Sequence, residues 1–266
     1  MARTHRGVPI RSADELVKAR RAAQLAAEVL AMIEPHVVPG VTTEALDQLC
    51  HDHIVNVQGA RPANVGYLGY PKTVLTSVNH VVCHGIPSPQ QVLKKGDIVN
   101  IDVAVEKDGW YGDTSRMFCV GTPSTLAQQL VHTTYEALCA GIREVKPGAT
   151  LGDVGHAIAA VAHRENFSVV REYCGHGIGT VYHDEPQVLH YGRRGQGLRL
   201  EAGMVFTIEP GLYFQPDDLT VPEEYRGIGV RIEDDIVVTE DGCVNLSAGI
   251  PREADAVEAW VRKLRG

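Results

Sequence analysis

The sequence predicts an α+β protein built from two related halves, with helices packed on a largely antiparallel sheet. Lys95–Asp102 reads KGDIVNID and, 107 residues later, Ala202–Glu209 reads AGMVFTIE, so an apolar strand is followed by an acid twice. A VPGVTTEAL run around Pro39 is echoed by a KPGATLGDV run around Pro147. Helical periodicity precedes strand-like runs in both halves, an order typical of helices packed on antiparallel strands. We therefore expect one internally duplicated domain.

The first half begins with two predicted helices. Ser12 and Glu15 have the spacing of a capping box, and apolar residues then recur at helical intervals until Pro35. A second helix is expected from about residue 42 to residue 57. The stretch at 60–90 is rich in Gly, Pro and Tyr and predicts short strands and loops.

A β-hairpin is predicted at 96–120, because two strand-like runs flank an Asp-Gly dipeptide suited to a two-residue turn. Such a turn pairs Ala104 with Asp113, and Asp102 lies two residues from Ala104 on the same face. Asp102 and Asp113 are then diagonal neighbours, with backbones about 7–8 Å apart. Two carboxylates at that separation can hold one cation between them, and without a cation they would repel each other.

The second half repeats the order of the first. Helices are expected at about 124–145 and 151–165, followed by strands that carry VVREYC, MVFTIEPGLYF and VRIEDDIVVT. A short amphipathic helix is expected at 252–264. The whole chain, 1–266, is thus interpreted as a single domain whose pseudo-two-fold halves cover about 12–120 and 121–246.

Composition narrows the function classes. The formal net charge is −8 and no long Lys/Arg run occurs, which disfavours direct nucleic-acid binding. The six cysteines show neither CxxC pairs nor zinc-finger spacing, as is typical of reduced thiols in a cytoplasmic protein. No apolar run is long enough to cross a bilayer, so we expect no membrane partner. We expect a cytoplasmic monomer.

Further residues extend the carboxylate pair into a candidate metal site. Glu209 and Glu233 follow strand-like runs, and His176 is flanked by glycines in GHGIG, seven residues before His183. Carboxylate ligands with one imidazole suit hard or borderline divalent ions. The alternative, that these acids are solvated surface groups, is less consistent with the apolar run before Asp102. Four other acids are expected in solvent, namely Asp97, Asp108, Asp234 and Asp235.

Four strings make the chain resemble the type I methionine aminopeptidases, members of the pita-bread metallopeptidase superfamily: YPKTVLTSVNHVVCHGIP, VNIDVAVEKDGWYGDTSRMF, GHGIGTVYHDEPQVLHY and FTIEP. The resemblance covers about residues 12–246. It implies the curved sheet of the pita-bread fold and two divalent ions per chain, which could be Co, Mn, Fe or Zn. The implied ligands are Asp102, Asp113, His176, Glu209 and Glu233, with Asp113 and Glu233 bridging the ions.

The resemblance also implies roles in catalysis. Glu209 would act as general base while remaining a ligand, His84 would contact the scissile amide, and His183 would bind the carbonyl oxygen as it becomes negative. The side chain of the substrate would be bound in a pocket whose implied lining residues are Tyr67, Tyr70, Cys83 and Tyr182. His84 and His183 would then belong to both the catalytic and the substrate-binding sets.

The implied function is removal of the initiator methionine from nascent polypeptides, with the ribosome as a further partner. Two alternatives stay open. The segment at 211–235 lacks the expected tryptophan, and its GIGVRIEDD string is closer to the X-Pro peptidases, prolidase and aminopeptidase P. A non-catalytic binding protein of the same fold is the third possibility, although such proteins lose metal ligands and all five candidates are present here.

Overall fold

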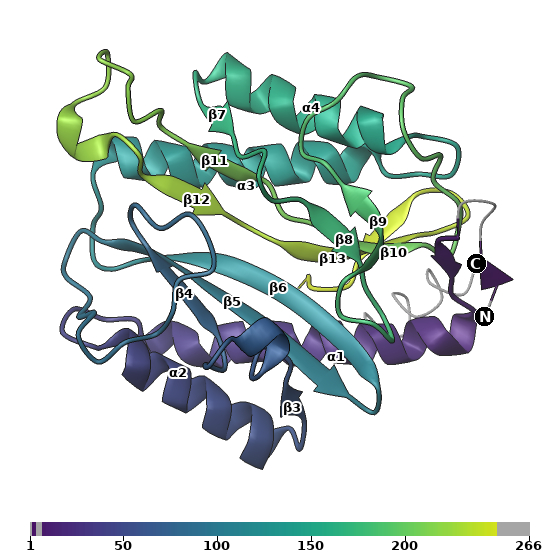
Figure 1. Cartoon of the computed structure of the whole chain (residues 1–266), viewed down its shortest axis with the longest axis horizontal. Helices are drawn as coiled ribbons and strands as arrows, with labels where there is room; N and C mark the ends of the chain where they lie inside the picture. Colours follow the sequence, from purple (N-terminus) through teal and green to yellow (C-terminus); the bar gives the residue numbers. More distant parts are fainter. Residues whose placement is uncertain (1, 4–6, 249–266) are drawn as a thin grey trace, which may run out of the picture.

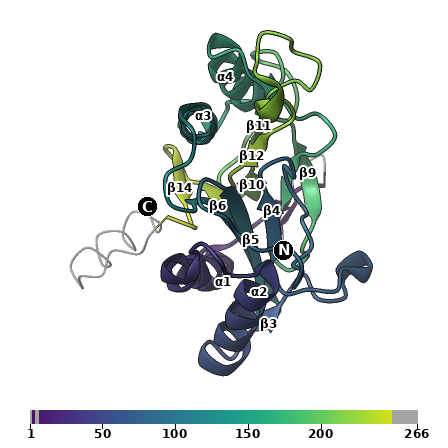
Figure 2. The same ribbon diagram turned by 90° about the vertical axis from the view of Figure 1, so that its left-hand side faces the viewer.

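The computed structural model describes residues 2–3 and 7–248. The helices form two pairs, α1 with α2 and α3 with α4, and the strands lie between the pairs (Figure 1). In the turned view, β4 and β9 lie on the side of the molecule away from α1 and α3 (Figure 2). The terminal helix predicted at 252–264 lies outside the described residues.

Both predicted helices of the first half are present. α1 spans Ala13–Ile33, and its first turn has the predicted capping box between Ser12 and Glu15. α2 spans Thr43–Asp52 and continues as a π-helical turn at His53–Val57, so the predicted end near residue 57 is confirmed with a wider last turn. Buried apolar side chains of these helices pack against the strand β5 in one core cluster.

The hairpin has the predicted register. β5 (Ile98–Lys107) and β6 (Trp110–Cys119) are antiparallel, and Ala104 is paired with Asp113. The two turn residues have positive φ angles of 52° and 81°, the conformation that an Asp-Gly dipeptide accommodates. Asp102 lies inside β5 and not at its end, because β5 continues for five residues beyond it.

Four further short strands precede this hairpin in the sequence. β3 (Arg61–Pro62) and β4 (Leu75–Val78) both pair with β5. β1 (Ala2–Arg3) pairs with β2 (Pro9–Ile10) in a separate two-stranded ribbon. All of these pairings are antiparallel, as the sequence predicts.

The second half also begins with two helices, α3 (Thr125–Glu144) and α4 (Leu151–Arg164). Its strands form two antiparallel groups, β14-β13-β10-β8-β9 and β12-β11-β7. The bounds of these strands are β7 Ser168–Val169, β8 Gly175–Gly177, β9 Asp184–Val188, β10 Val205–Ile208, β11 Gly211–Tyr213, β12 Gly229–Arg231, β13 Asp234–Val238 and β14 Cys243–Asn245. Of the expected VVREYC strand, only the first valine lies in β7.

The two halves meet along β6. Ser115 of β6 forms an antiparallel bridge with Glu233, between β12 and β13, and the amide of Asn100 in β5 donates to the carbonyl oxygen of Arg231 at 2.6 Å. Apolar side chains of the second half form a separate core cluster around α3 and α4. Buried polar side chains, among them Asn100, Ser115 and Glu233, lie at the seam between the halves.

Candidate metal centre

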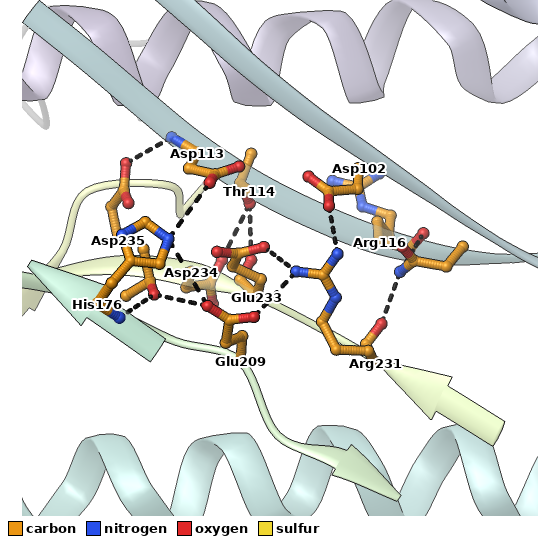
Figure 3. A network of polar contacts seen from close by, with 12 residues as sticks. Asp102, Asp113, Thr114, Arg116, His176, Glu209, Arg231, Glu233, Asp234 and Asp235 are labelled. Carbon is orange, nitrogen blue, oxygen red and sulfur yellow. Dashed lines mark hydrogen bonds and ion pairs between the residues drawn. The ribbon is translucent and has the colours of Figure 1, made fainter. Parts of the chain in front are cut away.

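The five predicted metal ligands lie together on one wall of a cavity. They come from five different segments: β5, β6, β8, the residue after β10 and the β12–β13 junction. Each is buried, with exposures between 1% and 8%. Figure 3 shows their side chains pointing toward one another across the seam. The residues brought together are Asp102, Asp113, His176, Glu209 and Glu233.

The spacing of the ligand atoms suits a small cation. The imidazole Nε2 of His176 lies 3.7 Å from an oxygen of Asp113 and 3.7 Å from an oxygen of Glu209. One ligand atom each from Asp113, His176 and Glu233 lies within 4.8 Å of the others. These are distances across a coordination sphere, longer than most direct hydrogen bonds.

Unpartnered carboxylate oxygens indicate what the site accommodates. Asp102 Oδ1, Asp113 Oδ1 and Glu233 Oε1 are buried without a hydrogen-bond partner in the described part of the chain. A buried oxygen without a partner is costly, and a buried carboxylate is normally paired or bound to metal. The donor set of carboxylates and one imidazole therefore fits a divalent cation.

Burial and mutual repulsion raise the pKa values of three of these acids. Burial raises the pKa of Asp113 to about 7, with the charge of Asp102 adding to the shift. Burial likewise raises the pKa of Glu209, and it raises the pKa of Glu233 well above its ordinary value together with the charge of Asp113. A cation among the carboxylates would offset this repulsion and favour their charged forms.

Neighbouring polar groups fix the orientation of the ligands. The hydroxyl of Thr207 donates to Glu209 Oε1 at 3.0 Å and accepts the backbone N–H of His176 at 3.0 Å. The backbone N–H of Glu209 donates to His190 Nε2 at 3.0 Å. Burial lowers the pKa of His190 to about 3, which keeps Nε2 free of a proton and able to accept. Thr207 and His190 were not found in the sequence, where neither carries a distinctive motif.

The placement of Asp234 and Asp235 in solvent was wrong. Asp235 is 1% exposed, and its Oδ2 accepts the backbone N–H of Asp113 at 2.9 Å. Asp234 is half-buried and accepts from the side-chain amide of Asn245 at 2.7 Å. Strand alternation could have revealed Asp235, because it lies two residues from Glu233 and shares its face.

The other two acids expected in solvent differ in how exposed they are. Asp108 is exposed in the hairpin turn, as predicted. Asp97 is half-buried, and its carboxylate accepts from the backbone N–H of Lys94 and from the side-chain amide of Asn79. Asp97 is therefore only partly exposed, and its hydrogen bonds hold the loop that leads into β5.

His84 and His183 also line the cavity. The ring of His183 stacks on that of Tyr67, and its Nδ1 lies 2.9 Å from the Tyr67 hydroxyl. Burial, with the charge of His176, lowers the pKa of His183 to about 3, so its ring is neutral near pH 7. Burial also lowers the pKa of His84. The rings of His84 and Tyr173 pack edge to face, with their centroids 4.7 Å apart.

The cavity has a volume of about 560 Å³, and four tyrosines are among its lining residues. Tyr67, Tyr70 and Tyr182 line the cavity, as expected. The Tyr182 hydroxyl donates a hydrogen bond to Asn64 Oδ1 at 2.8 Å. Cys83 does not appear among the described residues of the lining. Two lining residues that the sequence reasoning missed are Leu75 and Cys174.

Arg231 is a further lining residue that the sequence reasoning missed. Its guanidinium is buried among the acids and contacts Asp102, Glu209 and Glu233 (Figure 3). In the sequence, Arg231 is one letter of the family-like string VRIEDD, and that string does not show where the side chain points.

Comparison with known proteins decides the family. The model of metallopeptidase family M24 matches residues 17–240. The chain belongs to metallopeptidase family M24. Within this family it is 51% identical to a methionine aminopeptidase from Salmonella typhimurium over 261 residues, covering 96% of this chain and 98% of the relative. The predicted resemblance to type I methionine aminopeptidases is thereby confirmed.

Solved structures of family M24 confirm the predicted fold. A crystal structure of methionine aminopeptidase from Rickettsia prowazekii matches with a TM-score of 0.84 and 46% identity, over 90% of this chain and 99% of that chain. Escherichia coli aminopeptidase P matches with a TM-score of 0.73 and 28% identity, over 96% of this chain and 60% of that chain. Among the described residues, the M24 chain has no helix long and apolar enough to cross a membrane.

Proposed function

We propose that the chain is a metal-dependent aminopeptidase that removes the N-terminal methionine from polypeptides. The observation that carries the proposal is the convergence of four buried carboxylates and one histidine on a cavity large enough for a side chain. Relatives named methionine aminopeptidase, about half identical over nearly the whole chain, support the same reaction.

The proposed ligands are Asp102, Asp113, His176, Glu209 and Glu233. Bound divalent ions would lower the pKa of water and polarise the scissile carbonyl. Asp113 and Glu233 are proposed as the bridging ligands, as the family resemblance implies, and each has a carboxylate oxygen without a protein partner among the described residues. The unpartnered oxygens thus support a ligand role for both acids.

Glu209 is proposed as the general base. Its Oε1 accepts from Thr207, and its backbone N–H is held by His190, so the carboxylate has little freedom to turn away from the cavity. A carboxylate fixed in this way is suited to remove a proton from water.

The two histidines are proposed to contact the substrate. A neutral His183, with Nδ1 at the Tyr67 hydroxyl, would direct Nε2 into the cavity, where it can donate to the carbonyl oxygen as negative charge develops. His84 stands at a positive φ of 59° against Tyr173 and is proposed to contact the amide that is cleaved. Neither side chain is needed to hold metal in this scheme.

The methionine side chain is proposed to lie against the tyrosines of the cavity. Tyr67, Tyr70 and Tyr182 line the cavity, and a thioether gains about 0.3–1.5 kcal/mol from each contact with an aromatic ring. Leu75 and Cys174 add apolar surface to the same cavity. Cys83 remains a proposed pocket residue that this lining does not support.

The proposal is tested by substrate choice. Purified protein, freed of metal and reloaded with Mn²⁺ or Co²⁺, is given Met-Ala-containing and Ala-Pro-containing peptides of equal length. We expect release of free methionine from the first peptide and no cleavage of the second. Cleavage of the Ala-Pro peptide with an intact Met-Ala peptide would contradict the proposal.

An X-Pro peptidase is the second candidate function. Arg231 favours it, because this residue belongs to the VRIEDD string that resembles X-Pro enzymes and its guanidinium lies in the cavity. Lack of any cleavage and of any metal uptake would instead favour the non-catalytic alternative. The same peptide pair and a metal analysis therefore separate all three functions.

Partners and location are proposed with the function. Nascent N-termini are the proposed substrates, which would bring the chain near the ribosome in the cytoplasm. A single domain and a monomeric state are also proposed. The two halves, about 12–120 and 121–246, would each supply part of the metal centre.

A further inference from the structure

A buried carboxylate on α2 contacts the loop that leads into β4. Asp47 is 7% exposed, and its Oδ1 accepts the backbone N–H groups of Thr73 at 2.8 Å and Val74 at 2.9 Å. Asp47 itself does not appear among the described residues that line the cavity. Its carboxylate therefore holds the main chain of the loop and is not placed to contact a molecule in the cavity.

Two other side chains on the same face of α2 contact this loop. Glu44 lies three residues before Asp47 and His51 four residues after it, a spacing that places all three on one face of the helix. Glu44 accepts from Lys72 Nζ at 2.6 Å, and His51 Nδ1 lies 2.9 Å from the Thr73 hydroxyl. Of the three, Asp47 is buried and the other two are half-buried, so its hydrogen bonds are the least exposed to water.

Hydrogen bonds continue from the two peptide groups to side chains of the cavity. The carbonyl oxygen of Thr73 accepts from Asn64 Nδ2 at 3.1 Å, and the carbonyl oxygen of Val74 lies 3.0 Å from the Tyr70 hydroxyl. Asn64 Oδ1 accepts in turn from the Tyr182 hydroxyl at 2.8 Å. Since Asn64, Tyr70 and Tyr182 line the cavity, one carboxylate outside the cavity is linked to three of its lining side chains.

The same network reaches the second half of the chain and the segment that carries His84. Tyr182 lies between β8 and β9 of the second half, whereas its partner Asn64 belongs to the first. The Tyr70 hydroxyl also lies 3.0 Å from the carbonyl oxygen of Gly85, the residue after His84. A shift of the loop would therefore change the shape of the cavity on more than one side.

The loop has little regular structure to hold it in place. Between β3 and β4 the chain forms a 3-10 turn at Tyr67–Gly69. Leu68 in this turn has a φ of 47° and a ψ of 28°, a left-handed conformation that residues with a Cβ rarely adopt, and its side chain is 92% exposed. Such a conformation persists where surrounding contacts over-determine it. The loop thus depends on contacts from outside, and α2 supplies several of them.

We propose that Asp47 is a positioning residue, which holds the loop at 64–75 in the shape that binds the side chain of the substrate. Without its acceptor oxygen, two buried N–H groups lose their partner, and the loop leaves the competent shape for part of the time. The apparent affinity for substrate then falls with the competent fraction, while substrate that has bound meets the same catalytic groups. The proposal rests on the proposed function for the identity of the substrate.

Steady-state kinetics of the metal-loaded full chain with the Met-Ala peptide test the proposal. Asp47→Ala should raise KM by about tenfold, as for a loop that is competent about one-tenth of the time, and should change kcat by less than about twofold. Asp47→Asn keeps an acceptor oxygen, so its KM should stay within about threefold of the wild type. An unchanged KM in Asp47→Ala, a fall in kcat alone, or equal defects in the two variants would overturn the proposal.

Asp52→Ala is the matched control on the same helix. Asp52 is exposed, and its carboxylate accepts from Gln48 Nε2 at 3.0 Å, within α2. Its removal should leave KM and kcat at the values of the wild type. A rise in KM equal to that of Asp47→Ala would assign the effect to α2 in general and would overturn the specific role of Asp47.

Hydrogen–deuterium exchange measured by mass spectrometry needs no substrate, so it separates this proposal from the proposed function. Backbone amides at 64–75 should exchange at least about tenfold faster in Asp47→Ala than in the wild type, and those of α4 should be unchanged. Faster exchange throughout the chain would indicate a general loss of stability and would overturn the positioning role. Wild-type protein that cleaves neither peptide, with the expected exchange in both proteins, would contradict the proposed function alone.

The wild type still decides the matter if Asp47→Ala does not fold. The amides of Thr73 and Val74 should then be protected from exchange in the wild type, because both donate to a buried carboxylate. In the folded Asp47→Asn variant, this protection should be largely kept. Exchange of these two amides in the wild type as fast as in an exposed loop would overturn the proposal.

Discussion

Glu209 combines two demands on a single side chain, since it is proposed both to hold metal and to remove a proton from water. The hydroxyl of Thr207 and the ring of His190 restrain it on two sides. A carboxamide at this position keeps the shape and one potential ligand oxygen but cannot accept the proton. The base role and the ligand role can therefore be separated by a conservative substitution.

Glu209→Gln should lower kcat by about 100-fold or more, because a positioned general base contributes roughly that factor. The measurement is the rate of methionine release from the Met-Ala peptide at saturating substrate, with metal content determined by elemental analysis. A rate close to wild type would remove Glu209 from the role of base. A low rate with no bound metal would assign the loss to the ligand role instead.

His84 and His183 are proposed to act on the substrate and not on the metal. His84→Ala and His183→Ala should each lower kcat by about 100-fold, since each removes a group that stabilises the transition state. Their metal content should stay near that of the wild type. His132→Ala, at a well-exposed histidine on α3, is the matched control and should retain full activity.

Some residues of the site could be predicted from the sequence and others could not. Seven of the predicted site residues are acids or histidines, and all seven line the cavity. Residue types and strand patterns indicated the acids, because metal chemistry needs such ligands, whereas His84 and the roles of both histidines were implied by the resemblance to the family. Thr207 and His190 act only through hydrogen bonds to the ligands, and such a role has no fixed residue type or spacing.

The helix α1 and the hairpin are the elements whose contact positions Asp113. At Gly112, directly before Asp113, the strand β6 approaches the backbone of α1 closely. A Cβ atom built there would lie 2.2 Å from the backbone of Ala22 and Ala23. No side chain can be accommodated at that distance without moving the helix or the strand.

Gly112→Ala should therefore destabilise the fold by about 1–3 kcal/mol or more, the usual cost of overpacking. The measurement is the free energy of unfolding from urea titration followed by circular dichroism. Gly242→Ala is the control, because a Cβ there meets nothing within 4 Å and its φ is not in the left-handed region. Equal stability of the two variants would mean that α1 can shift away from β6 at little cost.

Elements were predicted well where the signals were local. The capping box at Ser12 and the Asp-Gly turn of the hairpin depend on residues a few positions apart, and both are present as predicted. The expected strand at VVREYC was mostly wrong, because β7 holds only Ser168–Val169. Its pairing partner, β11, lies more than forty residues away, so its length is set by contacts that the local sequence does not encode.

The whole molecule depends on the seam where the halves meet. Asp102 and Asp113 come from the first half, and His176, Glu209 and Glu233 come from the second. An ion shared by both sets would bind the folded chain and not the unfolded one. The same ion would then stabilise the fold as well as serve the reaction.

Removal of metal should lower the melting temperature by about 5–10 °C. A ligand at 100 times its dissociation constant contributes about 2.7 kcal/mol, and each kcal/mol shifts a domain of this size by about 2–4 °C. Differential scanning calorimetry before and after chelation measures the shift, and Mn²⁺ should restore it. An unchanged melting temperature, in protein shown to have lost its metal, would argue against ligands that join the halves.

The sequence by itself determined the fold class, the helix starts and the hairpin register, since each depends on residue type and short-range periodicity, and its family-like motifs implied the candidate ligands. Only the tertiary structure decided what surrounds those ligands. Arg231 reaches Asp102 across 129 residues, and Asp235 accepts from Asp113 across 122. The physical reason is that burial and charge at the seam arise when the halves pack together, so no short stretch of either half contains them.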